Sequence, residues 1–239
     1  MEGFLYGIAL QWKLDLRNKG ILITYYIVPL VFFIFMGGIF TSIDPTAYKT
    51  LIPAMTVFGV TMGSIIGAPT SLVETFRSDI KKSYIVGGIP LWTVVVNNFI
   101  SGFIHLFIMS IGIFIIAPIA FNATVPENYF VYFITLTMFI ATSLTVGTVL
   151  GLVVKTVSRL TMISQFIFLP SIMLSGIMFP SSMLPNILQK LGSIFPATWG
   201  YKCMTNINID ILFISPLLII LLICVVVVIW KLKSLIGDK

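Results

Sequence analysis

The sequence predicts an all-α membrane protein with six transmembrane helices, and two observations carry this prediction. Of the 239 residues, 58% are hydrophobic and only 9% are charged, whereas a soluble domain carries about a quarter charged residues. Six charge-free stretches also reach the ~20 residues that a helix needs to cross a bilayer. Lipid offers the backbone no hydrogen-bond partners, so we expect every span to be helical.

The segment before the first apolar stretch, residues 1–19, predicts a helix that lies in the membrane interface. Four apolar residues recur there at every fourth position, which places them on one face of a helix. They are Phe4, Ile8, Trp12 and Leu16. Charged residues, Asp15 among them, occupy other positions on the helix, as in amphipathic helices that bind membrane surfaces.

The six spans belong to a single transmembrane domain that covers residues 1–239. We place them at residues 21–41, 51–73, 91–117, 130–154, 160–178 and 211–231. Pro118 is expected to end the third span, because proline lacks the N–H that an interior helical residue donates.

The distribution of Lys and Arg predicts the topology. With the N-terminus inside, eleven of the 14 Lys and Arg residues fall in inner segments, and the outer loops hold Lys49, Lys190 and Lys202. Cytoplasmic loops show this excess of positive charge. Both termini are therefore expected in the cytoplasm. We attribute the net charge of +6 to the positive inner loops and to their attraction to anionic lipid headgroups, and not to nucleic-acid binding.

Residues 74–88, between the second and third spans, predict a cytoplasmic amphipathic helix. Nine consecutive positions hold five charged residues, too many for the hydrocarbon core. These are Glu74, Arg77, Asp79, Lys81 and Lys82, and the apolar face consists of Phe76, Ile80 and Tyr84. Gly87-Gly88 and Pro90 are expected to stop the helix. Such a helix suits docking to a partner or to the membrane surface.

The outer segment at residues 179–209 is too apolar for an ordinary loop. Its prolines divide it into pieces too short to cross a membrane. We expect half-helices that dip back into the outer leaflet, because irregular backbone is tolerated there when it packs against protein or lines a cavity.

The sequence contains no recognisable catalytic or ATP-binding motif. It has no G-x-x-x-x-G-K-[ST], H-E-x-x-H or G-x-S-x-G pattern. Cys203 and Cys224 form no C-x-x-C pair, so we expect no metal site. His105, the only histidine, lies in the third span. A lone histidine there can be a proton relay, a substrate contact or a packing residue. Because the sequence shows no evident carboxylate partner for it, we favour the packing role. An energy source is expected on another chain.

These features resemble the permease subunit of ABC-2 type (type V) ABC transporters. Residues 74–90, followed by Leu91-Trp92, are similar to the cytoplasmic coupling helix of that family. Residues 169–201 are similar to its P-x-x-x-L-S-G-x-x-x-P-x-x-x-L-P pattern. The matching positions are Pro170, Leu174, Ser175, Gly176, Pro180, Leu184 and Pro185, with Pro196 ahead of the last span.

The resemblance implies the partners of this chain. A second permease copy, identical or a sister permease, would complete the pore, and two ABC ATPase subunits would bind ATP and Mg. This chain itself would be no enzyme and would bind no cofactor or metal. Phe76, Ile80 and Tyr84 would anchor the coupling helix in an ATPase groove, with Arg77, Lys81 and Lys82 as polar contacts. The interfacial helix would also touch the ATPase.

The resemblance further implies export across a bacterial cell membrane, with residues 179–209 as the outer gate. An amphipathic or hydrophobic cargo, such as a drug, an antimicrobial peptide or a lipid-like molecule, suits a short chain without a large outer domain. A polysaccharide or teichoic-acid exporter is an alternative. A stand-alone channel or immunity protein without an ATPase is another, and an intramembrane enzyme lacks a catalytic set.

Overall fold

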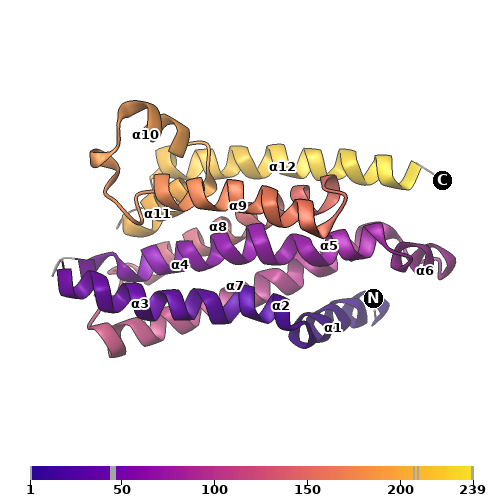
Figure 1. Ribbon diagram of the computed structural model, residues 1–239, viewed down its shortest axis with the longest axis horizontal. Coiled ribbons are helices and arrows are strands. Elements are labelled where there is room, and N and C mark those ends of the chain that lie inside the picture. Colours follow the sequence, from indigo (N-terminus) through magenta and orange to yellow (C-terminus); the bar gives the residue numbers. More distant parts are fainter. Residues whose placement is uncertain (1, 44–46, 207, 209, 238–239) are drawn as a thin grey trace.

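The computed structural model describes residues 2–43, 47–206, 208 and 210–237, and over these residues its regular structure is helical throughout (Figure 1). The helices form an elongated bundle. The short helix α6 (Ile80–Val86) lies at one end and the short helix α10 (Asn186–Gly192) at the other. We call these the α6 end and the α10 end.

Six helical stretches of the described residues are long and apolar enough to cross a membrane, which confirms the predicted fold class. The spans are α2 (Lys19–Leu22), η1 (Ile23–Ile27) and α3 (Val28–Ile43); α4 (Leu51–Met62), η3 (Gly63–Gly67) and α5 (Ala68–Arg77); α7 (Leu91–Phe121); α8 (Tyr129–Val153); α9 (Val157–Leu174); and α12 (Ile211–Gly237). The remaining elements are α1 (Glu2–Arg17), η2 (Ala47–Lys49), η4 (Ser181–Met183) and α11 (Pro196–Thr205), besides α6 and α10.

The third span is longer than expected. The prediction ended it at residue 117, but α7 continues through Pro118 to Phe121. A proline removes one backbone donor, and membrane helices tolerate that loss when the surroundings compensate for it. The helix ends instead at Asn122, which adopts a left-handed conformation with φ of 51°.

The bounds of the fifth and sixth spans also differ from the predicted ones. The fifth span was expected at residues 160–178, but α9 covers Val157–Leu174. It begins early because the Thr156 side chain accepts a hydrogen bond from a backbone N–H of the first turn. The sixth span was expected to end at residue 231, and α12 continues to Gly237.

Span two (α4, η3 and α5) forms the centre of the bundle. Of its apolar stretch, 89% is buried, compared with 6% for α12. Its glycines are places of close approach, because a Cβ on Gly63 would collide with Leu106 and Tyr25. From the other side, a Cβ on Gly147 of α8 would collide with the backbone oxygen of Ser64. Small residues thus let three other helices approach the backbone of span two.

A π turn in span two binds span five to it. The π turn η3 ends at Gly67, two residues before Pro69. Pro69 has no N–H to donate to the carbonyl of Ile65, four residues earlier. The hydroxyl of Ser164 on α9 donates to that carbonyl at 2.7 Å. A backbone group that proline leaves without its usual donor therefore becomes an interhelical contact, as expected where lipid cannot supply a donor.

Replacement of Gly147 tests this packing. Gly147→Ala places a methyl group against the Ser64 carbonyl, and we expect it to destabilise the bundle by about 1–3 kcal/mol, as overpacking does. The measurement is the thermal midpoint of the detergent-purified protein, followed by size-exclusion chromatography.

Gly112→Ala on α7 is the matched control, because nothing lies within 4 Å of a Cβ at that position. Equal melting of the two variants would contradict the close approach of α8 to span two.

Candidate functional site

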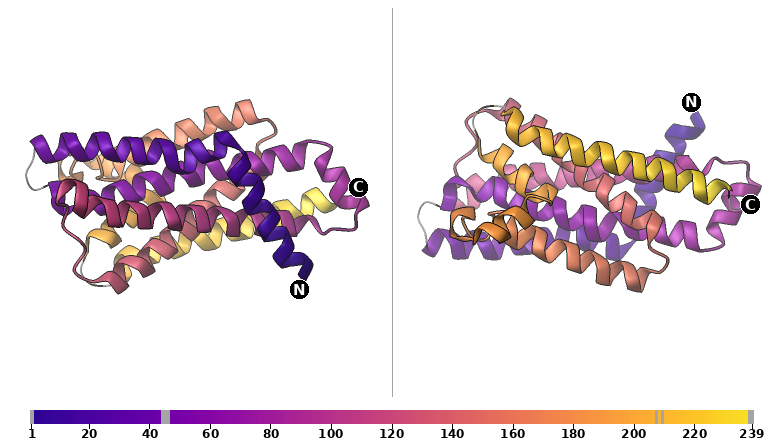
Figure 2. Two further views of the ribbon diagram at one scale, coloured as in Figure 1. Left: turned by 90° about the horizontal axis from the view of Figure 1, so that it is seen from below. Right: turned by 90° about the horizontal axis from the view of Figure 1, so that it is seen from above.

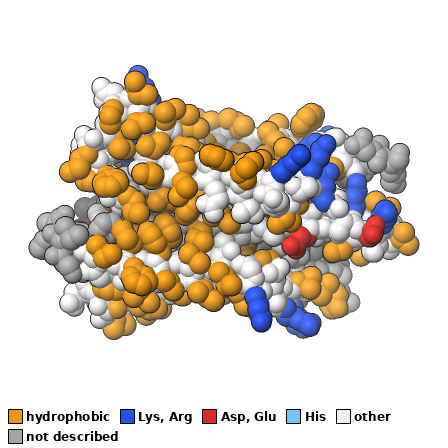
Figure 3. Space-filling model, viewed as in Figure 1, with side chains coloured by type: hydrophobic (Ala, Val, Ile, Leu, Met, Phe, Trp, Pro, Cys, Tyr) orange, Lys and Arg blue, Asp and Glu red, His pale blue; other side chains and the backbone are white. Residues whose placement is uncertain are grey.

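The α6 end carries the basic surface of the molecule. Figure 3 shows Lys and Arg side chains gathered toward this end, while hydrophobic side chains cover most of the remaining visible face. Helix α1 also lies at this end and crosses the direction of the spans (Figure 2). The candidate functional site is the surface formed by α1, α6 and the turn into α7, which we call the α1–α6 surface.

The predicted coupling helix is two helices. Residues 74–88 were expected to form one helix, but α5 extends to Arg77, and α6 begins at Ile80. Ser78 between them is extended, and its hydroxyl accepts a hydrogen bond from the Ile80 N–H at 3.3 Å. Serine side chains compete with helical hydrogen bonds in this way. As a result, Glu74, Phe76 and Arg77 belong to the end of span two.

Phe76 is buried within its own chain. It is 4% exposed and packs in a cluster with Leu72, Val94 and Leu152. The expectation that Phe76 anchors the helix in a groove of a partner is therefore corrected: this ring supports the base of α6. Of the other two expected anchors, Ile80 is exposed and Tyr84 is half-buried against the same cluster.

Two of the predicted docking cations bind the ends of other helices of this chain. Arg77 donates to the carbonyl of Leu152, in the last turn of α8, at 3.3 Å. Lys81 donates to the carbonyl of Leu235, near the end of α12, at 3.1 Å. Cations at helix C-termini satisfy terminal carbonyls and complement the helix dipole. These two residues hold α6 against the bundle.

The remaining charged residues of this region are exposed. Lys82 and Asp79 form an ion pair of 2.8 Å on the surface of α6. Glu74 lies on the exposed side of α5. Exposed pairs of this kind contribute little to stability, so their side chains can exchange partners at little cost.

Apolar side chains that sequence reasoning missed are exposed at the end of α6. Val86 is 88% exposed, and Ile85 and Ile89 are also exposed. Prediction followed the four-residue spacing from Phe76 to Tyr84 and left these residues out. The apolar run Tyr84-Ile85-Val86 just before the Gly87-Gly88 stop was the available signal. Gly88, with φ of 65°, turns the chain toward α7.

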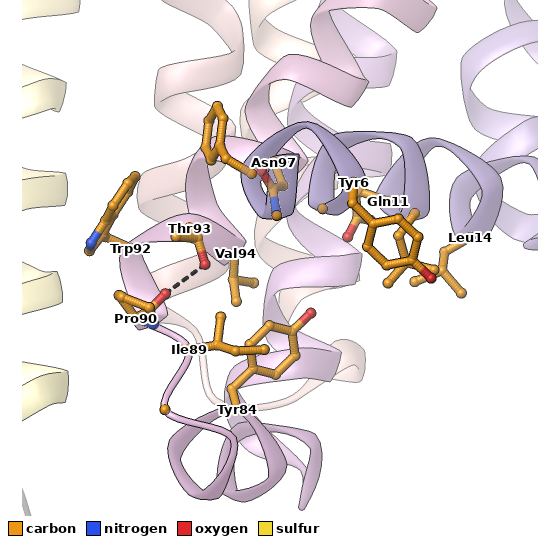
Figure 4. A pocket seen from close by; sticks show the side chains of 15 residues that line it. Tyr6, Gln11, Leu14, Tyr84, Ile89, Pro90, Trp92, Thr93, Val94 and Asn97 are labelled. Atoms are coloured by element: carbon orange, nitrogen blue, oxygen red, sulfur yellow. Dashed lines mark hydrogen bonds between the residues drawn. The ribbon is translucent and has the colours of Figure 1, made fainter. Parts of the chain in front are cut away.

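A groove of about 770 Å³ lies between α1 and the turn from α6 into α7 (Figure 4). Tyr6, Leu10 and Leu14 line it from α1, and Tyr84, Ile89 and Trp92 line it from the other side. No charged residue is among those that line it. Its chemistry suits an apolar side chain or helix face rather than an ionic ligand.

The face of α1 that was predicted to lie on lipid packs on α7 instead. Phe4, Ile8 and Trp12 are half-buried, and the Phe4 ring lies 6.2 Å from that of Trp92. Leu16, the fourth predicted member, is 43% exposed. The actual contact face is rotated from the predicted one because it includes Asp15.

Asp15 is buried, although sequence reasoning placed it among the solvated charges. It is 2% exposed and accepts hydrogen bonds from the Ser101 hydroxyl at 2.6 Å and the Gln11 amide at 2.9 Å. The described residues provide it with no ion pair. Burial raises the pKa of this carboxyl above its usual value, and the hydrogen bonds from Ser101 and Gln11 oppose that effect.

His105 is buried on α7 and forms a 2.7 Å hydrogen bond between its Nδ1 and the Tyr26 hydroxyl. This agrees with the packing interpretation. The nearby carboxylate that sequence reasoning did not find comes from α1, because Asp15 bonds to Ser101, one turn before His105. Within the described residues, no three His, Cys, Asp or Glu side chains are grouped as a metal site would need.

The L-S-G part of the outer motif is a helix-ending turn. Helix α9 ends at Leu174, and the Ser175 hydroxyl accepts from the Ile177 N–H at 3.4 Å and donates to the Ile172 carbonyl at 2.8 Å. Gly176 has φ of 93°, which only glycine adopts readily. The chain therefore leaves span five at this point and turns back along the bundle.

The prolines of the outer motif delimit its short elements. Pro180 precedes η4, Leu184 follows it, Pro185 precedes α10, and Pro196 is the first residue of α11. Proline suits the start of a helix, where no N–H is required. Residues 207 and 209, at the end of the predicted outer segment, lie outside the described residues.

The two half-helices pack on protein. Gly192 at the end of α10 lies against the Leu174 carbonyl, where a Cβ would be 2.7 Å from the oxygen. The Thr198 hydroxyl donates to the Gly192 carbonyl at 2.6 Å. Gly200 of α11 lies against the ring of Phe139, ten residues into α8, a depth of about 15 Å. The segment thus reaches well below the start of α8.

Six apolar spans, two half-helices packed at one end and a basic surface at the other define a multi-pass membrane protein. The family model described as ABC-2 type transporter matches residues 3–209, and the chain belongs to this family. No curated protein sequence gave a match. A domain of this family is the membrane-spanning permease component of an ABC transporter.

The burial of Asp15 predicts a pH dependence of stability. Because its pKa is raised in the folded protein, folding is favoured at low pH, and this contribution is lost as pH rises through the raised pKa. Asp15→Asn removes the titration and keeps an acceptor for Ser101. We expect the thermal midpoint of Asp15→Asn, relative to wild type, to increase from acidic to neutral pH.

Asp79→Asn, which removes an exposed carboxylate, controls for the change in net charge. A constant difference between Asp15→Asn and wild type across this pH range would show that Asp15 has no raised pKa.

Proposed function

We propose that this chain is the permease subunit of an ATP-driven exporter that moves an amphipathic or hydrophobic cargo out of a bacterial cell. The observation that carries the proposal is the α1–α6 surface. An apolar groove and exposed apolar side chains stand there beside many cations, in a chain of the ABC-2 family that has no ATP-binding motif of its own. Such a surface fits an ATPase that supplies the energy.

The α6 end is assigned to the cytoplasm. The described residues place Arg77, Lys81 and Lys82 there, together with α1 and the end of α12. Excess Lys and Arg mark cytoplasmic segments of membrane proteins. Both termini are then cytoplasmic, and the half-helices at the α10 end lie on the outside, where they form the outer gate.

ATPase docking uses the apolar residues of α6 rather than its cations. Arg77 and Lys81 are engaged with the ends of α8 and α12. Val86, Ile85 and Ile80 are exposed on a helix that faces water in this topology. Apolar side chains of this kind are typical centres of protein interfaces. Two ATPase subunits with bound ATP and Mg would serve two permease copies.

A second permease copy is assigned to the exposed face of α9. This face carries Thr161 and Gln165 beside Phe166 and Leu169. A polar amide that faces lipid lacks a partner, so it favours contact with another protein helix. The exposed face of α12 offers a contrast, since Ile219, Leu222, Val226 and their exposed neighbours are apolar and suit lipid.

Charge introduced on α6 tests ATPase docking. Val86→Asp puts a carboxylate in the proposed apolar interface, and we expect most of the co-purifying ATPase to be lost while the permease still inserts in the membrane. The measurement is the amount of ATPase that is purified with the tagged permease from its native membrane.

Ile187→Asp is the matched control. It makes the same change at an exposed apolar position, on the seven-residue helix at the opposite end. Equal ATPase recovery with both variants would contradict docking on α6, and a reference chain that purifies without any ATPase would overturn the proposed function.

Cysteine crosslinking tests the dimer. In a variant without Cys203 and Cys224, Phe166→Cys on α9 is expected to give a covalent dimer upon mild oxidation in the membrane. Leu222→Cys on α12, at a similarly exposed position, is expected to remain monomeric. The reverse pattern would assign the second copy to α12 instead.

A further inference from the structure

Beside the α1–α6 surface, three elements meet around the ring of His105. The Trp12 ring of α1 stacks on it with centroids 3.9 Å apart and planes at 6°. The Tyr25 ring of η1 is also stacked, at 5.3 Å and 14°. The Tyr26 hydroxyl bonds to Nδ1, while the other nitrogen, Nε2, has no partner in the described residues. Stacking and this one hydrogen bond therefore hold the imidazole.

A second contact joins α1 to α7 one turn away. The carboxylate of Asp15 accepts from Ser101 at 2.6 Å. Asp15 follows Trp12 by three residues on α1, and Ser101 precedes His105 by four on α7. Two contacts at one-turn spacing on both helices fix the rotation of α1 about its own axis as well as its position, because neighbours at these spacings share a helix face.

In a third contact, the backbone of α1 at Gly7 lies directly against a side chain of α7. A Cβ on Gly7 would be 2.5 Å from the amide nitrogen of Asn97. The face of α7 that meets α1 carries three residues at intervals of four, which are Asn97, Ser101 and His105. The seam thus extends from Gly7 to Asp15, over the middle and the C-terminal part of α1.

The attachment of α6 is different in kind. None of its residues is buried, and it is attached through the half-buried Tyr84 ring, the Lys81 side chain and the preceding Arg77. Each of these cations contributes a single hydrogen bond, at 3.3 Å for Arg77 and 3.1 Å for Lys81. Of the two helices at the α1–α6 surface, α1 is the one with a buried, directional attachment to the spans.

We propose that α1 moves as one rigid unit with spans one and three, and that Asp15 and His105 are the positioning residues of this joint. The inference rests on the proposed function, in which a partner at the α6 end displaces α1. Displacement of α1 then turns spans one and three directly, with no hinge between α1 and α7.

A disulfide across the seam tests the rigid joint. In a background without Cys203 and Cys224, Gly7→Cys and Asn97→Cys are introduced together into the full complex with its ATPase. We expect oxidation to leave ATP hydrolysis by the complex at the level of the reduced protein. Loss of hydrolysis on oxidation, with recovery on reduction, would show that α1 must leave α7 and would overturn the proposal. The Asn97→Cys variant alone, which leaves Gly7 in place, controls for oxidation elsewhere.

Spin-label distances test the positioning residues without an ATPase. One label replaces Lys13 on α1 and the other Ile119 near the end of α7, both exposed, in chains diluted with unlabelled protein. We expect a narrow distance distribution that broadens in Ser101→Ala, in Asp15→Ala and in His105→Ala. A merely stabilising role would lower the thermal midpoint without broadening this distribution.

Ser110→Ala is the matched control, because Ser110 is equally buried on α7 but, within the described part of the chain, donates to Leu106 of its own helix and not to α1. Equal distributions in Ser101→Ala, Ser110→Ala and the reference protein would overturn the role of Asp15. If the reference chain purified without an ATPase, the proposed function would fail, whereas the distance measurement would still decide whether the joint exists.

Discussion

The close approach of helices to span two is the constraint on which the rest of the bundle depends. Lipid tails are as apolar as leucine, so helices in a membrane gain no hydrophobic energy by associating. The free energy of their association must come from close packing instead. Gly63, Gly147 and Gly151 each lie where a Cβ would collide with a neighbouring element. These contacts bring α7 and α8 onto span two and leave α12 at the periphery.

The same solvent explains where polar groups are placed. A backbone carbonyl without a donor is costly in lipid, and side chains from other elements supply the missing donors. Ser164 serves the carbonyl that Pro69 leaves without its usual donor, and Arg77 and Lys81 serve the ends of α8 and α12. Several hydroxyls and cations of this chain are thus structural, although as isolated residues they resemble binding groups.

The sequence predicted the fold well because hydropathy reports directly on length and lipid exposure. Six spans and the half-helices follow from local chemistry, whereas the turn at Gly176 falls inside the fifth span as it was predicted. It failed where a neighbouring helix decides the outcome. Asp15 looked solvated because a helical wheel cannot show Ser101 opposite it, and Phe76 looked exposed because its cluster is formed by α7, α8 and α12.

The coupling region illustrates the same limit at the level of helices. The charges between spans two and three correctly placed this segment at a basic end of the molecule, but the break at Ser78 depends on one side-chain hydrogen bond. Which cations are available to a partner depends on carbonyls 75 and 154 residues away in sequence. No periodicity within the segment could reveal those contacts.

The length of α7 has a consequence for the lipid around it. Its 31 residues extend for about 46 Å, whereas the hydrocarbon core is roughly 30 Å thick. A helix with this excess tilts or projects, and the balance changes with bilayer thickness. Because Asp15 and Trp12 fix α1 to this same helix, thickness of the membrane acts on the angle at which α1 is presented. Hydrophobic mismatch thereby changes the orientation of α1 at the α6 end without any bound ligand.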